Sequence, residues 1–404
     1  MTFNDPAGAL PAWALAALKG CEAEFERFER VSLENTRRVM GAFARHRISD
    51  RHFQSATGYG YNDLGRDTLD ALMADVFGAE DALVRAQFVN GTHAIACALR
   101  AACPQGGYLS LAGEPYDTLR GVMPYEYVPC DGAGAPDFAA IERRLKNKNY
   151  PAVLIQRSRG YSDRQTLSID CIEQIIRIVK SVDANTVTVV DNCYGEFCET
   201  REPPAVGADL TAGSLIKNPG GGLAPTGGYV AGRKALVDKA GEALTVPGIG
   251  RECGASLGLN RLFYQGLFMA PHTVCQALKT AAFAARALYS LGFDVSPKPG
   301  EARGDIIQSV AFGNREKLLE FTRGIQASSP VDSFVTPEPW AMPGYDCDVV
   351  MAAGTFIQGA SIELSCDAPM RAPYRAFLQG GLTFESGLLC VVNAITRVTD
   401  AGGG

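Results

Sequence analysis

A single lysine, Lys217, stands where a short apolar run gives way to proline and glycine, in the stretch GSLIKNPGGG of residues 213–222. Most lysines are simply solvated, and a solvated loop position is the alternative here. Apolar residues precede Lys217, however, and the glycines after it let the backbone pass close to a bound ligand. A lysine in an apolar cleft has a lowered pKa and can form a Schiff base with an aldehyde. We therefore expect a lowered pKa and carbonyl chemistry at Lys217.

Two other features precede Lys217 in the chain. Asp191 ends the apolar run VTVVD, and the carboxyl ends of parallel strands are where α/β proteins bind ligands. An acid there can pair with a cationic ring nitrogen, a metal or a sugar hydroxyl, or it can simply cap a turn. The other feature is VNGTHAIACALRAA, residues 89–102, a glycine turn that enters a helix. Amides at a helix N-terminus can bind an anion such as phosphate.

Taken in order, these three features match the needs of pyridoxal 5′-phosphate. The helix amides can hold its phosphate, Asp191 can keep its ring nitrogen protonated, and Lys217 can bind its aldehyde. A protonated ring draws in electrons when the Cα–H bond of an amino acid breaks. Each feature alone is ambiguous, but the ordered set predicts this cofactor.

The elements that must position these residues follow from the hydrophobic pattern. Residues 1–50 have apolar positions at helical spacing and predict a helical arm. Residues 55–80 begin as a glycine-broken loop and continue as a helix, with Asp67 as its expected N-cap. From residue 83 to about 232, short buried runs such as 151–156 and 187–191 alternate with amphipathic helices. This alternation predicts a doubly wound α/β layer.

A change of texture near residue 270 predicts a second domain. A helical stretch over 272–292 leads into shorter expected strands at 305–312, 349–356 and 359–365. We therefore expect an α/β protein with three parts: an N-terminal helical arm (1–50), a large cofactor-binding domain (51–270) and a smaller C-terminal α+β domain (271–404).

Composition excludes several classes of protein. The 404 residues are 47% apolar and 20% charged, with a formal net charge of −6, which argues against a nucleic-acid footprint. No apolar run reaches the roughly 18 residues of a membrane span, and the first residues do not read as a signal peptide, so a cytoplasmic protein is expected. The twelve cysteines form no CxxC pair and the four histidines lack metal-ligand spacing. We expect reduced thiols, with Cys193 as core, and no metal site.

Five longer motifs extend this interpretation to a family. They are TGYGYNDLGRDTLD (57–70), NGTHAIACAL (90–99), VVDNCYGEFCETREP (189–203), GADLTAGSLIKNPGGGLAPTGGYVAGR (207–233) and MAAGTFIQGASIEL (351–364). Together they resemble the aluminium-resistance or methionine γ-lyase-like family of pyridoxal phosphate proteins, over about residues 30 to 390. The resemblance implies the aspartate-aminotransferase-like fold (fold type I), in the cysteine/methionine-metabolism branch. It also implies homodimers or homotetramers with active sites at the subunit interface.

The resemblance assigns roles around the cofactor. Lys217 would carry it and shuttle protons, and Asp191 would bind its ring nitrogen. Tyr116 is similar to the tyrosine that stacks on the ring and acts as an acid toward the leaving group. The phosphate would be held by the amides of Gly91, Thr92 and His93 and the hydroxyl of Ser214. His93 itself is more often a packed side chain than a catalyst.

Other roles concern the partner subunit and the substrate. Tyr59 and Arg66 lie in the loop that reaches the neighbouring subunit's phosphate in related lyases, with Tyr61 as an alternative to Tyr59. Arg371 is expected to bind the substrate carboxylate, with Arg303 and Arg375 as rivals.

Two departures from the family pattern leave the substrate open. The chain runs from PYDTLRGVMP directly into YEYVPCDGAG, residues 125–134, where a longer glycine-rich insertion is expected. Arg251 stands where a small residue is expected. We expect both features near the active-site mouth.

The prediction is a lyase that eliminates a group from Cβ or Cγ of an L-amino acid. A thiolate is the first choice of leaving group, as in a carbon–sulfur lyase; the alternative is a halide or other group whose γ-elimination leaves an alkene or alkyne amino acid. A protein that binds pyridoxal phosphate without catalysis is a further alternative. A dinucleotide reductase is disfavoured, because GYGYNDLG (58–65) lacks the GxGxxG spacing.

Overall fold

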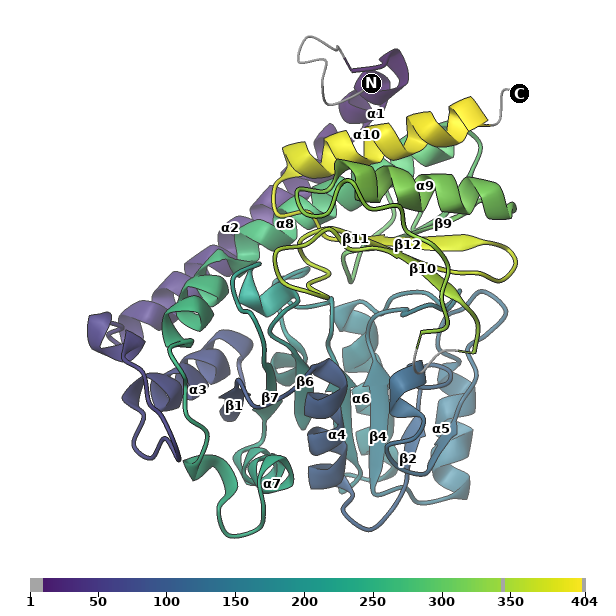
Figure 1. Ribbon diagram of the computed structural model, residues 1–404. Coiled ribbons are helices and arrows are strands. Elements are labelled where there is room, and N and C mark those ends of the chain that lie inside the picture. The colour runs from purple at the N-terminus through teal and green to yellow at the C-terminus, as the bar shows by residue number, and fades with distance from the viewer. Residues whose placement is uncertain (1–9, 343–345, 402–404) are drawn as a thin grey trace. The chain divides into compact units, whose positions relative to one another are not determined.

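The chain forms two compact units, which a computed structural model describes over residues 10–342 and 346–401 (Figure 1). The large unit comprises Glu34–Ala270, and the small unit joins the residues up to Leu33 with those from Pro271 onwards. Two long helices, α2 (Glu22–Arg45) and α8 (Asn260–Ser290), contribute to both units. The change of unit after Ala270 therefore falls inside a continuous helix.

The described part of the large unit is built on a seven-stranded sheet in the order β1-β7-β6-β5-β4-β2-β3. Strands β2 to β6 run parallel, and β7 is antiparallel to both β6 and β1. The strands are β1 (Asp81–Arg85), β2 (Tyr108–Ser110), β3 (Tyr125–Tyr127), β4 (Ala152–Gln156), β5 (Val187–Asp191), β6 (Leu210–Ser214) and β7 (Gly228–Gly232). The strands expected within 151–156 and 187–191 are confirmed.

Helices cover both faces of this sheet. They are α3 (Leu64–Phe77), α4 (Gly91–Ala102), α5 (Phe138–Asn147), α6 (Ile169–Val182) and α7 (Lys234–Leu244). Helices α4 and α7 share one apolar core with Leu154 of β4, whereas α5 and α6 share another with Val153 and Ile155. Because side chains on both faces are buried, the strands read as continuous apolar runs. The expected doubly wound α/β layer is confirmed.

Helix α3 begins earlier than the sequence pattern suggests. Its N-cap is Asp63, whose Oδ1 accepts a hydrogen bond from the Arg66 amide at 3.0 Å. The expected cap, Asp67, lies in the first turn and accepts from the Arg66 guanidinium instead. The prediction of Asp67 was wrong because two aspartates four residues apart both suit a helix start.

The described part of the small unit has the expected α+β architecture. Its five-stranded antiparallel sheet has the order β10-β11-β12-β9-β8. Its further elements are α1 (Ala12–Gly20), β8 (Asp294–Ser296), β9 (Ile307–Ala311), α9 (Arg315–Ser328), β10 (Val349–Ala352), β11 (Ser365–Pro369), β12 (Arg375–Gln379) and α10 (Phe384–Ala401). A strand over 359–365 is not found. The Glu363 carboxylate accepts hydrogen bonds from the backbone amides of Phe356 and Ile357, and the segment forms turns before β11.

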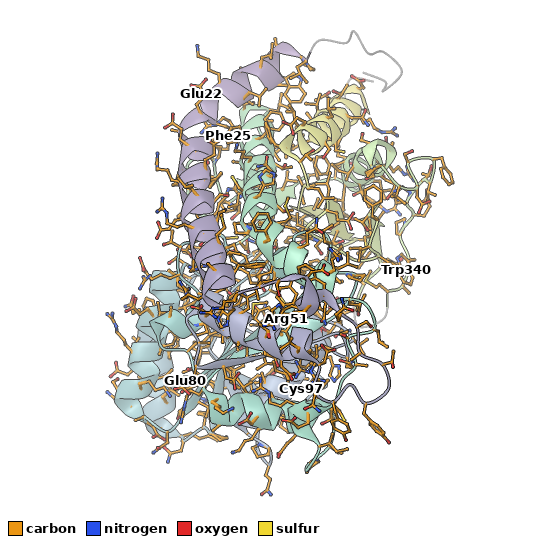
Figure 2. All side chains as sticks on the ribbon, turned by 90° about the vertical axis from the view of Figure 1, so that its left-hand side faces the viewer. Glu22, Phe25, Arg51, Glu80, Cys97 and Trp340 are labelled. Carbon is orange, nitrogen blue, oxygen red and sulfur yellow. The ribbon has the colours of Figure 1, made fainter. Side chains whose placement is uncertain are left out.

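Within the small unit, the first part of α2 packs along α8 (Figure 2). Glu29 pairs with Lys279 at 2.6 Å, and the Phe25 ring meets Phe384 edge-on with centroids 5.0 Å apart. Within the described ranges, no helix is long and apolar enough to cross a bilayer.

Candidate active site

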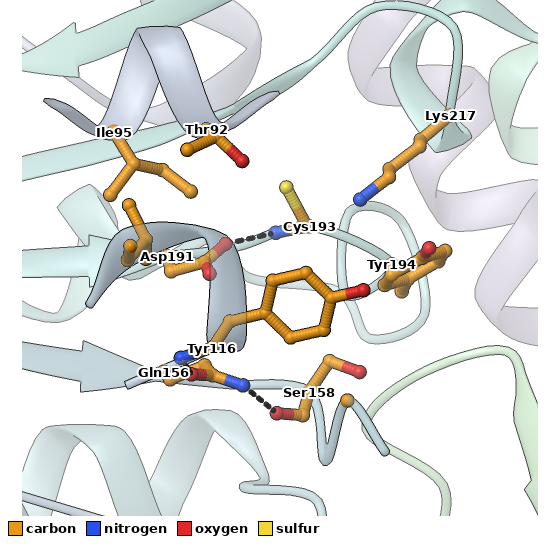
Figure 3. A pocket seen from close by; sticks show the side chains of 11 residues that line it. Thr92, Ile95, Tyr116, Gln156, Ser158, Asp191, Cys193, Tyr194 and Lys217 are labelled. Atoms are coloured by element: carbon orange, nitrogen blue, oxygen red, sulfur yellow. Dashed lines mark hydrogen bonds between the residues drawn. The ribbon is translucent and has the colours of Figure 1, made fainter. Parts of the chain in front are cut away.

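The carboxyl edge of the large sheet brings the predicted residues together. Asp191 ends β5, Lys217 follows β6 by three residues, and Thr92 lies in the first turn of α4. Their side chains line one pocket together with Tyr116, Cys193 and Tyr194 (Figure 3). Parallel strands end at the same edge, so residues far apart in sequence meet there.

Asp191 is a buried acid at the floor of this pocket. Its side chain has 7% exposure, and Oδ1 accepts a hydrogen bond from the Cys193 amide at 3.1 Å. Burial raises the pKa of the Asp191 carboxyl, although Lys217 and the Cys193 amide act in the opposite direction. A second cation near this carboxyl, such as a protonated ring nitrogen, would stabilise its ionised form.

Lys217 lies against an aromatic ring and among acidic groups. Its amine lies 3.9 Å from the centroid of the Tyr194 ring. Burial acts to lower the pKa of Lys217, but Cys193, Tyr194, Asp191 and Glu196 outweigh it and raise that pKa above the ordinary value. The expected lowered pKa is therefore wrong for the protein without cofactor, because the cleft contains acidic groups as well as apolar ones.

The N-terminus of α4 offers backbone amides to the pocket. Asn90 caps the helix, and its Oδ1 accepts a hydrogen bond from the His93 amide at 2.9 Å. The His93 amide, expected on phosphate, is therefore engaged by the cap. Helix geometry leaves the amides of Gly91 and Thr92 without an intrahelical acceptor. The His93 ring packs edge-on against Phe88, and burial, followed by Arg100, lowers its pKa.

The Ser214 hydroxyl, beside the N-terminus of α4, bears on whether a phosphate group fits there. Its side chain is 1% exposed, and Oγ has no hydrogen-bond partner among the described residues. A Cβ at Gly91 would lie 3.3 Å from the Ser214 Cβ and 3.2 Å from the Cys193 Sγ, so α4 begins directly against the end of β6. A buried hydroxyl without a partner is costly, and a phosphate oxygen at this point would satisfy it. The residues present therefore fit the phosphate of pyridoxal phosphate.

Tyr116 projects into the pocket from the segment after β2 (Figure 3). Gln156, the last residue of β4, fixes the position of Tyr116: its Oε1 accepts a hydrogen bond from the Tyr116 amide at 2.9 Å. A Cβ at Gly160 would approach the Tyr116 ring within 3.0 Å, so only glycine allows this close packing. Gln156 was missed in the sequence, although it ends its strand just as Asp191 does. Cys193 is buried as expected, yet it also lines the pocket.

A buried carboxyl and a buried tyrosine hydroxyl, those of Glu196 and Tyr229, form a pair in the large unit. Glu196 Oε1 accepts a hydrogen bond from the Tyr229 hydroxyl at 2.8 Å, and Oε2 has no partner among the described residues. Burial raises the pKa of Glu196 to about 8. A Cβ at Gly213 would lie 2.5 Å from Glu196 Oε1, so the strand before Lys217 needs glycine there. Sequence periodicity carried no signal for this pair.

Tyr59 and Tyr61, on one loop, are not among the residues lining this pocket. The two rings stack with centroids 5.6 Å apart and are 72% and 57% exposed, respectively. Arg66 is buried, and its guanidinium donates to the carbonyl oxygens of Gly60 at 2.7 Å and Gly254 at 3.0 Å. Arg66 thus holds the loop that presents both tyrosines.

The three candidate carboxylate-binding arginines all belong to the small unit. Arg371 pairs with Asp346 at 3.0 Å, and Arg375 pairs with Asp294 at 3.0 Å. Arg303 is buried and donates to Gln308 Oε1 at 2.6 Å. The role of Arg371 stays a prediction.

Arg251 does not line the Lys217 pocket. Its guanidinium lies 3.0 Å from Asp70 and 2.6 Å from Asp81, next to the Arg85–Asp70 pair at 2.7 Å. We call these four residues the Arg251 cluster. Two acidic residues, from α3 and β1, neutralise Arg251, and its place near the active-site mouth stays a prediction. Among the described residues, no group of three or more His, Cys, Asp or Glu could hold a metal ion.

Comparison with known proteins defines the class. The sequence profile of the methionine gamma-lyase family matches residues 12–399, and the chain belongs to this family. The protein YnbB of Bacillus subtilis (strain 168) is 48% identical over 393 residues, which are 93% of this chain and 92% of YnbB.

Two solved structures are similar to this chain in fold as well as in sequence. A carbon–sulfur lyase involved in aluminium resistance from Clostridium novyi NT is 47% identical with a TM-score of 0.91, over 96% of this chain and 95% of that one. A candidate cystathionine β-lyase involved in aluminium resistance from Clostridium acetobutylicum is 46% identical with a TM-score of 0.92, over 96% and 94%. The pyridoxal phosphate-dependent protein YhfS of Escherichia coli, at 16% identity and a TM-score of 0.61, shares the fold alone. The fold is that of pyridoxal phosphate enzymes of fold type I.

Proposed function

We propose that this protein is a pyridoxal phosphate-dependent lyase that eliminates a group from Cβ or Cγ of an L-amino acid. The observation that carries the proposal is one pocket containing the Lys217 amine and the Asp191 carboxyl, next to the buried Ser214 hydroxyl without a partner. Membership of the methionine gamma-lyase family and the likeness to a carbon–sulfur lyase support it. We infer that the leaving group is a thiolate.

The proposed cofactor would be held at several points by the residues of this site. The amides of Gly91 and Thr92 and the Ser214 hydroxyl would bind the phosphate, Asp191 the ring nitrogen and Lys217 the aldehyde carbon. When bound, pyridoxal phosphate withdraws electrons from Cα of the amino acid attached to it. Tyr116, fixed by Gln156, would cover the ring with its aromatic face.

Proton movements then fall to two side chains. Lys217 must be neutral before its amine can bind a carbonyl or take the α proton of the substrate, and its raised pKa opposes this loss of the proton. The Tyr116 hydroxyl would give a proton to the departing group, which leaves more easily when neutral. For γ-elimination, Lys217 would also move a proton at Cβ.

A second copy of the chain would complete the site. Tyr59 and Tyr61 expose large apolar rings on one loop, and Arg66 fixes that loop from behind. We infer a homodimer or homotetramer in which these rings face the partner. Light scattering of Tyr59→Ser/Tyr61→Ser should show a weaker association than the wild type, whereas an unchanged assembly would contradict this inference.

The first test is the visible absorption spectrum of the purified protein with added pyridoxal phosphate. Lys217→Ala should lose the band of a lysine-bound cofactor, whereas Lys146→Ala, on the surface with a 62% exposed side chain, should keep it. A panel of cystathionine, methionine and halogenated amino acids should then yield keto acid, ammonia and the leaving group. A band without turnover would favour a non-catalytic binding protein. No band would overturn the proposal.

A halide as leaving group is the alternative within the same chemistry. The missing insertion before Tyr125 is the feature that keeps it open. Release of halide ion and an unsaturated amino acid, without thiol release from cystathionine or methionine, would replace the thiolate assignment.

A further inference from the structure

The turn that follows Asp191 has an unusual backbone. Tyr194 has φ of 71° and Phe197 has φ of 62°, both in the left-handed region. Residues other than glycine seldom occupy this region, and they do so most often where the surroundings hold them for a functional purpose. The turn begins after Asp191 and includes Glu196, and Tyr194 lines the pocket.

The loop that carries Lys217 holds this turn in place. Asn218, directly after the lysine, is fully buried, and its Nδ2 donates to the carbonyl oxygens of Tyr194 and Glu196, each at 2.9 Å. Cys198 Sγ donates to the same Tyr194 oxygen at 3.3 Å. The position of Tyr194 is thus tied to the position of Lys217 through adjacent residues.

The side chains of Tyr194 and Lys217 also meet. The Lys217 amine lies 3.9 Å from the ring centroid (Figure 3). An ammonium within about 6 Å of an aromatic face is attracted by the negative charge of that face, more strongly where water is excluded. The carboxyls of Asp191 and Glu196 compete for the same cation, and an ion pair with Asp191 would occupy the acid needed by a ring nitrogen.

We propose that Tyr194 is a positioning residue for Lys217: the face of its ring holds the Lys217 ammonium whenever that amine is not bonded to the cofactor. The ring carries no charge, so it keeps the cation within reach of the site without occupying a carboxylate. The inference deepens the proposed function and rests on it for the identity of the cofactor. The contact itself belongs to the protein without cofactor.

The test measures the reactivity of the Lys217 amine in the full-length protein stripped of cofactor with hydroxylamine. Brief acetylation with acetic anhydride at a series of pH values, followed by peptide mass spectrometry, gives a rate for each lysine. Lys148 is the internal reference, because its ammonium lies 5.1 Å from the Tyr150 ring on the protein surface. Only the neutral amine reacts, so the rate reports how firmly the proton is held.

Three variants distinguish the ring face from other causes. Tyr194→Leu removes the ring and should raise the Lys217 rate, relative to Lys148, by about tenfold at a given pH, or one pKa unit. Tyr194→Phe keeps the ring and should stay within about twofold of the wild type. Tyr127→Leu removes an exposed ring from β3 and should change nothing. Tyr194→Met replaces Tyr194→Leu if the latter does not fold.

Two results would overturn the proposal. One is an unchanged Lys217 rate in Tyr194→Leu and Tyr194→Met. The other is an equal increase in Tyr194→Phe, which would give the role to the hydroxyl. Failure of the proposed function would look different: wild-type protein would show no band with pyridoxal phosphate, while the acetylation rates would still respond to Tyr194.

A second readout separates the lysine from the rest of the site. Pyridoxamine phosphate lacks an aldehyde and binds without a bond to lysine. Tyr194→Leu should bind it no more tightly than the wild type does, yet capture pyridoxal phosphate faster than the wild type at the same pH. Equal losses for both ligands would indicate a damaged pocket and would also count against the proposal.

Discussion

Two groups of buried or half-buried charges in the large unit differ in how completely their acids are paired. In the Arg251 cluster, the carboxylates of Asp70 and Asp81 accept from Arg85 and Arg251 at 2.6–3.0 Å. Burial opposes ionisation of Asp81, but Arg251 prevails and lowers the pKa of its carboxyl. Each acid in this cluster is paired with an arginine of the same chain.

The Lys217 pocket shows the opposite pattern. Burial raises the pKa of Asp191 and of Glu196, and Ser214 Oγ and Glu196 Oε2 have no hydrogen-bond partner among the described residues. Paired charges hold a fold together, whereas buried polar groups without partners cost free energy and persist where a ligand completes them. The contrast teaches that complete pairing of the acids, more than the number of charges, separates a structural cluster from a candidate site. It also predicts which substitutions affect turnover and which affect stability.

The largest effect is expected from Asp191→Asn. Without a carboxylate, the ring nitrogen would lose the charge that keeps it protonated, so turnover should fall by about 10²–10³-fold. Asp81→Asn, in the Arg251 cluster, is the matched control and should lower the free energy of unfolding while turnover per folded molecule is kept. Steady-state kinetics and urea titrations measure both. If Asp191→Asn kept full turnover and Asp81→Asn lost it, the comparison would be reversed.

Arg251→Ala should act on stability. It leaves Asp70 and Asp81 with fewer partners, and the free energy of unfolding should fall by about 3 kcal/mol. The control Arg233→Ala removes a guanidinium that is 55% exposed and pairs with Asp209 at 3.2 Å, so it should cost at most about 1 kcal/mol. Altered substrate preference with unchanged stability would place Arg251 at the active-site mouth.

Glu196→Gln should change how stability depends on pH. Burial raises the pKa of Glu196 in the folded state to about 8, from an ordinary value of 4.5, so the folded state holds the proton more tightly, and the wild type loses stability as pH rises between these values. The groups around Glu196 are Tyr229, Glu202 and Lys217. Glutamine does not ionise, so the variant should gain on the wild type by about 2–3 kcal/mol from about pH 5 to pH 8.

Urea titrations at several pH values measure this difference, with exposed Glu242→Gln as the control for losing a surface carboxylate. A constant difference between Glu196→Gln and the wild type across the range would show that Glu196 is ionised in the folded protein.

Ser214→Ala should have the smallest effect, and it should separate stability from cofactor affinity. Without cofactor the variant should be as stable as the wild type, because the hydroxyl it loses has no partner, while pyridoxal phosphate should bind about tenfold more weakly. Ser168→Ala is the control: Ser168 caps α6 by accepting the Cys171 amide at 3.2 Å. That variant should lose about 1 kcal/mol of stability and no affinity. Similar behaviour of both variants would remove Ser214 from the phosphate site.

Much of the fold could be predicted because its strands and helices produce recognisable local patterns of apolar residues. The apolar runs at 151–156 and 187–191 and the helical stripe of α6 identify their elements without knowledge of their neighbours. Parallel strands end at one edge, so Asp191 and the loop of Lys217 had to lie near each other once the strands were assigned. Turns were harder: the segment 359–364 and the cap of α3 depend on which of several suitable side chains reaches a backbone amide.

By itself, the sequence determined the fold class and the residue types that suit pyridoxal phosphate, because strand and helix periods and a lysine before glycines are visible along the chain. Only the tertiary structure decided the charges and partners of those residues. Acidic neighbours raise the pKa of Lys217, whose amine lies over the Tyr194 ring, and Arg251 is neutralised by Asp70 and Asp81. Burial and through-space electrostatics set these properties, and both depend on residues distant in sequence.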